Sequence, residues 1–314
     1  MRATRDWFED ALVDVAGEHD RVVVVNCDLA SATKTAKFKK TFPERFFECG
    51  IAEANAIGVA AGLAQEGYRP FVASFGHFLT GKYLEIFQSV GLNDSGVVLV
   101  GTHAGLAIGK DGPTQMGLRD LALMRTLPNM RILHPADGIE TRQMLSFVAG
   151  QDQPTYLRLC RQAQREVHRP NYRFVFGQPD VVHHGRDVAV FTMGGMVEVL
   201  LDTLPELAGT GIDPTIVNVS SLPLDRDALA DVLGAHRHVW VVEDHFIKGG
   251  IADELARLVL ELDQDVHFGV WGVPDYGQAG SPDDLYARYQ LDPIGVAGRL
   301  RKFLRRQPSI EVKS

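Results

Sequence analysis

The sequence has few cysteines and no excess of positive charge. Its 314 residues include three cysteines, Cys27, Cys49 and Cys160, and no two of them form a C-x-x-C pair. An odd number of widely spaced cysteines argues against a disulfide scaffold or a zinc site and indicates a reducing cytoplasm. The formal net charge of −8 argues against binding to the phosphate backbone of nucleic acids.

Membrane spans, secretion signals and common catalytic motifs are also missing. No apolar run approaches the roughly 20 residues that cross a bilayer, and the N-terminal MRATRDWFEDALVDV reads as a charged amphipathic helix. The sequence contains no G-x-x-x-x-G-K-[ST], H-E-x-x-H or G-x-S-x-G motif, and CDLASATK follows the first strand candidate without a glycine. We therefore expect a cytoplasmic protein without membrane contact that is not a P-loop NTPase, zincin or nucleophile-elbow hydrolase.

Short β-branched runs alternate with helical segments twice along the chain. The first series has strands at 21–26, 69–75, 97–103, 130–135 and 155–159, with helices near 52–66, 78–91, 117–126 and 137–149. The second has strands at 188–193, 215–220, 238–244 and 266–272, with helices near 196–208, 225–235, 249–262 and 293–306. This alternation predicts two consecutive α/β domains with mostly parallel sheets, at 1–175 and 187–314, joined by a linker at 176–186.

Polar and aromatic residues follow the strands of the first predicted domain, at the edge where open α/β sheets bind ligands. They are Asp28 and Ser31 after the first strand, Phe75, His77 and Phe78 after the second, His103 after the third, and Arg158 and Arg161 after the last. His103 and Arg161, with Arg5 from the N-terminus, have the chemistry of a cationic clamp for phosphate. Each residue alone is equally compatible with a structural role.

Residues 48–67, ECGIAEANAIGVAAGLAQEG, place one carboxylate, Glu53, among small apolar side chains. Such a composition predicts a closely packed helix, in which an unpaired charge is costly. Glu53 is either an acid favoured at a helix start by the helix dipole or a residue with a functional purpose. The local sequence leaves both interpretations open.

Two longer blocks carry a family likeness. CGIAEANAIGVAAGLA and THAGLAIGKDGPTQMGLRDLALMRTLPNMRILHPADGIET resemble characteristic stretches of transketolase, and the resemblance covers essentially the whole chain. The chain resembles the C-terminal half of that enzyme, its pyrimidine-binding domain followed by its C-terminal domain. The G-D-G motif, with Asn-Asn further on, that holds Mg²⁺ and the diphosphate in this family is absent. The resemblance therefore implies one subunit of a split transketolase, which needs a separate diphosphate-binding N-terminal subunit, with an α2β2 assembly expected.

The resemblance also implies roles for residues around the cofactor, thiamine diphosphate. Glu53 matches the acid that hydrogen-bonds the aminopyrimidine ring and promotes its imino form, which then removes the thiazolium proton. Phe75 and Phe78 match the aromatic residues that enclose this ring, and Asp28 matches an acid near the cofactor. No metal ligand is expected on this chain, because the Mg²⁺ ligands are expected on the partner.

Substrate roles transfer in the same way. Arg5, His103 and Arg161 match sugar-phosphate-binding positions, His103 is also expected to take part in catalysis, and Asp111 matches the acid that contacts the sugar C2 hydroxyl. Two positions depart from the family: Gln115 stands where a histidine contacts the donor, and the phosphate-binding serine is either shifted to Ser31 or replaced by Ala32. Glutamine can donate a hydrogen bond but cannot carry a proton.

The sequence leaves alternatives to a ketol-transferring subunit. They are a β subunit of a 2-oxo-acid dehydrogenase-type enzyme, an enzyme similar to deoxyxylulose-phosphate synthase, and a non-catalytic paralogue. In the second domain, Glu243-Asp244-His245 could suggest an acid–base group. We interpret it as structural, because the resemblance gives that domain an assembly role.

Overall fold

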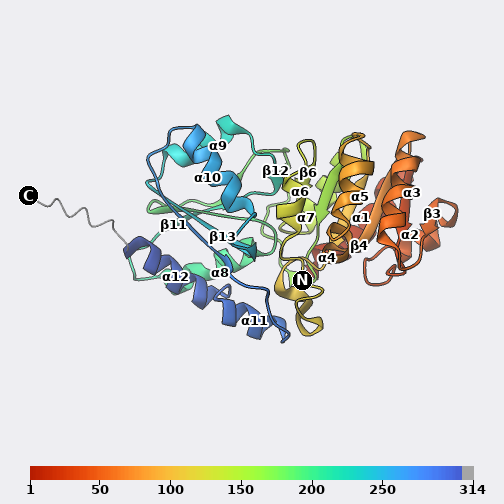
Figure 1. The fold of residues 1–314 in the computed structure, drawn as a ribbon. Helices are drawn as coiled ribbons and strands as arrows, with labels where there is room; N and C mark the ends of the chain where they lie inside the picture. The colour runs from red at the N-terminus through yellow and green to blue at the C-terminus, as the bar shows by residue number, and fades with distance from the viewer. Residues whose placement is uncertain (306–314) are drawn as a thin grey trace, which may run out of the picture.

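Two parallel-stranded α/β units lie side by side in the computed structural model of the chain, which describes residues 1–305 (Figure 1). The last residue of the predicted helix at 293–306 and the end of the predicted second domain, 306–314, lie outside the described residues. The predicted fold class is confirmed: both main sheets are mostly parallel and each has helices on its two faces.

The first sheet has seven strands in the order β12-β6-β7-β5-β4-β2-β3. All neighbours are parallel except β12, which runs antiparallel to β6. The strands are β2 (Val22–Asn26), β3 (Phe46–Glu48), β4 (Arg69–Phe75), β5 (Val98–Thr102), β6 (Arg131–Leu133), β7 (Thr155–Arg158) and β12 (Ser221–Leu222). Helices α1 (Thr4–Glu18) and α7 (Gly138–Ala149) cover one face. Helices α3 (Glu53–Gln65) and α6 (Asp120–Arg125) cover the other, which explains why the central strands are buried throughout.

The second sheet has five strands in the order β14-β13-β10-β11-β9, with β9 antiparallel to β11. The strands are β9 (Asp180–His183), β10 (Val188–Thr192), β11 (Pro214–Asn218), β13 (His238–Phe246) and β14 (His267–Val273). Helices α8 (Met196–Leu207) and α12 (Pro293–Arg305) pack on one face, and α9 (Arg226–Gly234) and α10 (Ile251–Glu261) on the other. Helix α11 (Pro282–Tyr289) lies beside the first unit (Figure 1).

The nine strands that the sequence predicts are all present. The predicted helix at 78–91 is instead three segments, α4 (Gly76–Thr80), α5 (Tyr83–Glu85) and the π-helical η2 (Ile86–Gly91). The sequence pattern does not predict β3, β12, α11, helix α2 (Ala36–Thr41), the 3₁₀ segments η1 (Pro43–Arg45) and η3 (Leu106–Asp111), or the short pair β1 (Arg2–Ala3) and β8 (Ala163–Gln164). Strand β9 falls inside the predicted linker, and the exact domain limits stay a prediction.

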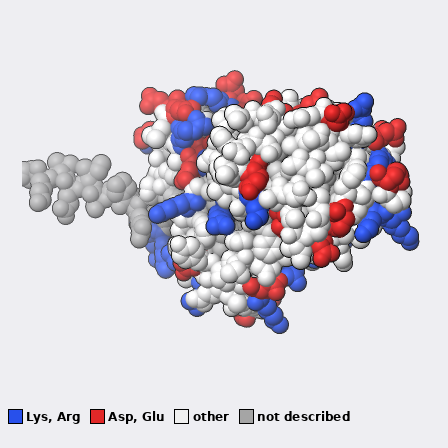
Figure 2. All heavy atoms as spheres, turned by 45° about the vertical axis from the view of Figure 1, so that its right-hand side comes forward, with Lys and Arg blue, Asp and Glu red and all other residues white. Residues whose placement is uncertain are grey.

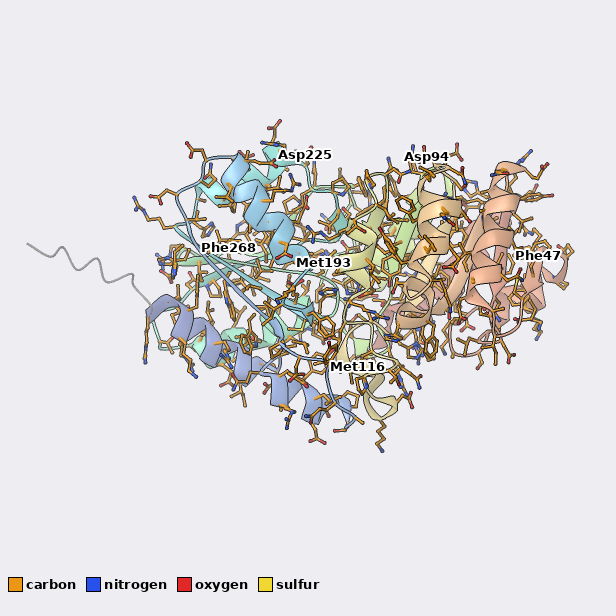
Figure 3. All side chains as sticks on the ribbon, in the orientation of Figure 1. Phe47, Asp94, Met116, Met193, Asp225 and Phe268 are labelled. Carbon is orange, nitrogen blue, oxygen red and sulfur yellow. The ribbon has the colours of Figure 1, made fainter. Side chains whose placement is uncertain are left out.

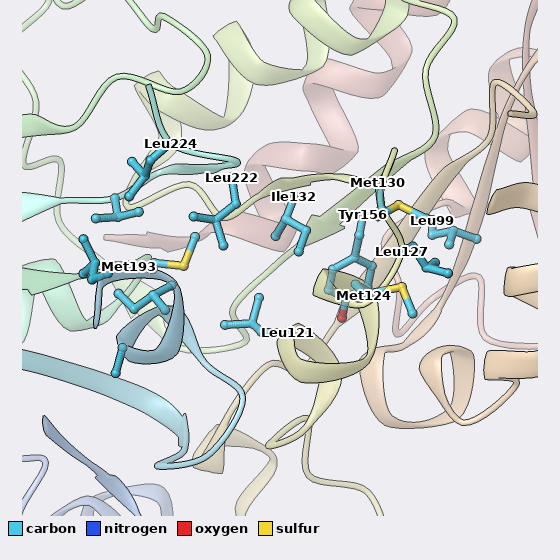
Figure 4. Close-up of a cluster of buried hydrophobic side chains, with 14 of the residues drawn as sticks. Leu99, Leu121, Met124, Leu127, Met130, Ile132, Tyr156, Met193, Leu222 and Leu224 are labelled. Carbon is cyan, nitrogen blue, oxygen red and sulfur yellow. The ribbon is translucent and has the colours of Figure 1, made fainter. Parts of the chain in front are cut away.

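The two units share one hydrophobic core. Leu121 and Met124 of α6, from the first unit, belong to the same buried cluster as Met193 and Leu222 from the second unit, and Figure 4 shows these side chains along the boundary. Strand β12 also adds a segment of the second unit to the edge of the first sheet. The boundary is therefore a packed interior, which holds residues of both units in fixed positions.

Candidate active site

The candidate site lies where the strand order of the first sheet reverses. From β2 the chain passes outward to β3 and then returns through α3 to β4, on the other side of β2. In open α/β sheets the crevice at the carboxyl ends of such strands is the usual ligand site. Glu53 is the first residue of α3 and is 8% exposed, so its carboxylate lies at this crevice.

Glu53 is held by a serine of the neighbouring strand. Ser74 Oγ donates a hydrogen bond to Glu53 Oε1 at 3.0 Å, which leaves Oε2 for another partner. Next to it, the rings of Phe75 and Phe78 stack with centroids 5.4 Å apart and planes 13° from parallel. Glu53, Phe78 and His77 line a pocket of about 300 Å³. A carboxylate beside an aromatic face suits a flat, nitrogen-containing ring.

His103 links this pocket to the predicted phosphate clamp. Its ring centroid lies 4.0 Å from that of Phe75, and its φ of +60° turns the chain at the end of β5. Arg5 Nη1 lies 2.7 Å from His103 Nε2, and Thr102 Oγ1 lies 2.9 Å from Nδ1. Because a guanidinium only donates, Nε2 must accept and Nδ1 carries the ring proton. Both ring nitrogens therefore have partners within the chain.

The clamp carries two positive charges and not the three that the sequence suggested. Burial, together with the nearby Arg5 and Arg161, lowers the pKa of His103 from its ordinary 6.5 to about 3. His103 is therefore neutral at physiological pH and orients Arg5 without adding charge. Its predicted part in catalysis stays a prediction.

The neutral state of His103 should make the free energy of unfolding depend on pH. The unfolded chain binds the imidazole proton near pH 6.5 and the folded chain only near pH 3. The contribution of neutral His103 to the free energy of unfolding is therefore complete above pH 6.5 and is lost as pH falls towards 3. Between pH 7 and pH 5, protonation of His103 in the unfolded chain should lower the free energy of unfolding by about 1–2 kcal/mol. His103→Gln should remove this part of the decrease in denaturant titrations. An unchanged pH dependence in the variant would contradict a neutral His103.

The two arginines of the clamp meet because the N-terminus pairs with a segment that follows β7. Strand β1 runs antiparallel to β8, with Arg2 opposite Gln164. The Cys160 N–H donates to Thr4 Oγ1 at 2.8 Å, which fixes the residues on either side. Arg5 is partly buried, and burial lowers its pKa, with Asp6 acting in the opposite direction and Arg161 in the same one. Arg161 is exposed, and its Nη1 donates to the Ile108 carbonyl at 3.0 Å.

The other predicted site residues lie in loops around this centre. Asp28 is exposed at φ +58°, and its N–H donates to Glu48 Oε1 at 2.7 Å. Ser31 is exposed beside Ala32, whose carbonyl accepts from Arg5 Nη1 at 3.2 Å, so this loop borders the clamp. Two more lie in the loop after His103: Asp111 is exposed at the end of η3, and Gln115 is partly buried.

Three residues near the site received no role from the sequence. Ser74 donates a hydrogen bond to Glu53, and Glu48 accepts one from the Asp28 N–H. His77 Nδ1 lies 3.1 Å from the carbonyl of Met116, the residue after Gln115. Ser74 could have been found, since it is the one polar side chain in the apolar run VASF. For His77 the sequence indicates only a polar residue after a strand.

Glu243, Asp244 and His245 do not form an acid–base group. Glu243 Oε2 accepts from the Ile251 N–H at the start of α10, and burial raises the pKa of Glu243 to about 8. Asp244 Oδ1 accepts from the Leu106 N–H, and His245 Nδ1 donates to the Phe246 carbonyl. Each side chain thus binds a different backbone group, as expected for structural residues.

The described residues contain neither a cluster of metal-binding side chains nor a membrane-spanning helix. Among residues 1–305, no group of three or more His, Cys, Asp and Glu side chains is placed to hold a metal ion. Within the same residues, no helix has both the length and the apolar character needed to cross a bilayer.

Comparison with known proteins gives the family. Residues 1–166 match the transketolase pyrimidine-binding domain, and residues 177–296 match the transketolase C-terminal domain. The chain is 30% identical over 311 residues to a protein of Methanocaldococcus jannaschii provisionally named a transketolase C-terminal section, with 98% of each chain covered. It is 35% identical over 304 residues to 1-deoxy-D-xylulose-5-phosphate synthase 2 of Geobacter sulfurreducens, covering 94% of this chain but 48% of that enzyme.

Solved structures of transketolases are similar to this chain as well. A structure described as a split gene transketolase, inactive beta4 tetramer, is 36% identical with a TM-score of 0.88, covering 97% of this chain and 99% of that one. The transketolase of Campylobacter jejuni, at 22% identity and a TM-score of 0.81, has the same fold over 96% of this chain and 46% of its own. The chain therefore belongs to the transketolase family, and it corresponds to that family's pyrimidine-binding and C-terminal domains.

Proposed function

We propose that this chain is one subunit of a split, thiamine-diphosphate-dependent transketolase, which transfers a two-carbon ketol unit between sugar phosphates. The observation that carries the proposal is the adjacency of two sites. The Glu53 pocket and the arginine clamp are joined by the contact between Phe75 and His103, at 4.0 Å between ring centroids. A cofactor ring and a phosphorylated sugar could thus be held side by side.

The residues present fit the aminopyrimidine end of thiamine diphosphate. Glu53 offers a free carboxylate oxygen for a ring nitrogen, and Phe78 offers an aromatic face at the same pocket. Mg²⁺ needs several oxygen ligands, and Glu53 is the single carboxylate among the residues that line this pocket. We therefore assign the diphosphate and its Mg²⁺ to a partner subunit that carries the diphosphate-binding motif.

We assign the chain's residues roles in activating the cofactor and in binding the substrate. Bound thiamine diphosphate would supply the nucleophilic carbon and carry the two-carbon unit. Glu53, oriented by Ser74, would exchange a proton with the aminopyrimidine nitrogen through Oε2. Arg5 and Arg161 would hold the substrate phosphate, while Asp111 and Gln115 would contact the sugar hydroxyls.

Arg161 gives a direct test of the clamp. Arg161→Ala should lower kcat/KM for phosphorylated substrates by about 10- to 100-fold, because one charge-assisted hydrogen bond contributes about 1.5–3 kcal/mol. Unphosphorylated sugars should be affected much less. Steady-state kinetics on a matched pair such as ribose 5-phosphate and ribose measures the difference.

Arg165→Ala is the matched control. Arg165 lies on the same segment but pairs with Asp202 at 2.6 Å, away from the clamp. It should leave both substrates unchanged. Equal losses on ribose and ribose 5-phosphate in Arg161→Ala would remove Arg161 from phosphate binding.

An uncovered apolar surface supports the proposed partners. Ile51, Leu84, Phe87 and Leu92 are large apolar residues with 84%, 60%, 40% and 73% of their surface exposed. On α3 beside them, a Cβ added to Gly58 or Gly62 would meet no atom within 4 Å. Figure 2 brings this side forward and shows charged side chains mainly around a broad uncharged area. Apolar faces of this kind mark protein interfaces, and we assign this one to the diphosphate-binding subunit and to self-association in an α2β2 assembly.

A deoxyxylulose-phosphate-synthase-like activity is the second candidate, because several curated relatives carry that name. The chain spans about half of their length. Such an activity would take pyruvate as donor. Supplying the assembled enzyme with xylulose 5-phosphate or pyruvate, each with an aldose phosphate acceptor, separates the two. We expect product with xylulose 5-phosphate as the donor. Product with pyruvate as the donor, and none with xylulose 5-phosphate, would overturn the ketol-transfer proposal.

A further inference from the structure

The loop that carries the predicted sugar contacts packs between the two units, with residues 104–109 buried and Asp111 exposed. Residues 104–116 follow His103 and include Asp111 and Gln115, and Figure 3 shows Met116 at the boundary between the units. Three glycines, Gly105, Gly109 and Gly112, have φ values of +70°, +73° and +81°. The loop thus adopts a conformation that most residues resist and that its surroundings must stabilise.

A carboxylate of the second unit holds the start of this loop. Asp244 of β13 accepts the Leu106 N–H on Oδ1 at 3.0 Å, and its Oδ2 accepts the Tyr286 hydroxyl of α11. The fit is close, since a Cβ built on Gly105 would lie 1.8 Å from Asp244 Oδ2. Asp244 and Tyr286 are both on the second unit, whereas Leu106 belongs to the first.

Helix α11 and the residues just before it also pack against the middle of the loop. A Cβ on Gly109 would lie 3.1 Å from the Gly280 carbonyl oxygen and from Pro282, at the start of α11, and one on Gly112 would lie 3.4 Å from Ala279. From the other side, Arg161 donates to the Ile108 carbonyl. The loop is therefore fixed between the clamp of the first unit and α11 of the second.

We propose that Asp244 and Tyr286 are positioning residues of the active site, through which the C-terminal domain sets the geometry of the 104–116 loop and thereby substrate binding. The proposal rests on the proposed function for its kinetic consequence. Releasing Leu106 frees the start of the loop, and the shift reaches Asp111, Gln115 and the Ile108 carbonyl that binds Arg161. The C-terminal domain thus acts on the substrate without touching it.

The two side chains can be changed without dismantling the boundary. The backbone of Asp244 is held separately, because its carbonyl accepts from Arg158 Nη2 at 3.0 Å. Tyr286→Phe removes one hydroxyl and keeps the ring. Tyr289→Phe is the matched control: it lies on the same helix, but its hydroxyl donates to Asp275 at 2.9 Å and not to Asp244.

The test combines amide hydrogen exchange with kinetics, on the full chain assembled with its diphosphate-binding partner. Tyr286→Phe and Asp244→Ala should speed exchange in peptides covering 104–116 about tenfold or more, the effect of losing one hydrogen bond. They should also raise KM for the phosphorylated donor several-fold, with a smaller change in kcat. Asp244→Asn keeps an acceptor for the Leu106 N–H and should restore most of both values.

The outcomes distinguish the positioning role of Asp244 and Tyr286 from the proposed ketol-transfer activity. Exchange and KM that stay at wild-type values in Tyr286→Phe and Asp244→Ala overturn it, as does an equal change in Tyr289→Phe. Faster exchange in the loop with unchanged KM also overturns it, because the loop would then be held but not linked to binding. Hydrogen exchange is measured without substrate, so a failure of ketol transfer itself would leave the loop result readable.

Discussion

Glu53→Gln should lower the turnover of the assembled enzyme by about 10²- to 10⁴-fold, the range for loss of a positioned proton-transfer group. The change keeps the size of the side chain, and the amide oxygen can still accept from Ser74 Oγ. Folding and pairing with the partner should remain intact, so the loss should appear in kcat. Single-turnover measurement of donor cleavage, together with the mass of the assembly in solution, checks both parts.

Glu66→Gln is the control for Glu53. Glu66 follows the last turn of the same helix, α3, and is exposed, so its replacement removes the same charge without reaching the pocket. It should leave turnover unchanged. A Glu53→Gln enzyme with wild-type turnover would show that Glu53 is only a favourable acid at a helix start, the alternative that the local sequence left open.

Arg158→Leu should lower the free energy of unfolding by about 3–5 kcal/mol, because removing one partner leaves a buried charge uncompensated. Arg158 is 2% exposed and its Nε binds Asp120 Oδ2 at 2.8 Å, where Asp120 is fully buried. Tyr156 donates to the same oxygen at 2.7 Å. The guanidinium also donates to the carbonyls of Gly117 and Asp244, one from each unit. Guanidinium chloride titration of the isolated chain measures the effect.

Arg165→Leu provides the comparison for an exposed ion pair. Its side chain is 40% exposed and that of its partner Asp202 is 44% exposed, so the expected change is within about 1 kcal/mol. Similar losses in the two variants would mean that the buried network does not hold the units together. A cooperative single transition in the wild type is expected from the shared core.

The sequence predicted the sheets well because their signals are local. Buried parallel strands such as β2 and β5 read as continuous β-branched runs. The helix predicted at 137–149 is present as α7, where the Asp137 side chain accepts from the Glu140 N–H at 2.9 Å. By contrast, the three segments at 76–91 were predicted as one helix, because their apolar pattern does not reveal a π-helical turn.

The sequence indicates candidate residues for the site but not the contacts between them. Arg5 and Arg161 are far apart in sequence, and they are brought together by the pairing of β1 with β8 and by the hydrogen bonds between Thr4, Arg5 and Cys160. The neutral state of His103 depends on burial that no local pattern encodes. The hydrogen bond from Leu106 to Asp244 spans 138 positions of the chain. Such contacts arise from tertiary packing, which one sequence does not display.

The central claim is that Glu53 and the clamp form half of an active site that a second chain completes. The direct measurement is the rate of ketol transfer from xylulose 5-phosphate to ribose 5-phosphate, with thiamine diphosphate and Mg²⁺ present. The chain is held constant while the diphosphate-binding partner is added. We predict no transfer without the partner and a rate that rises until the two chains are equimolar. Transfer by this chain alone, or no transfer at any ratio in a stable complex, would contradict the account.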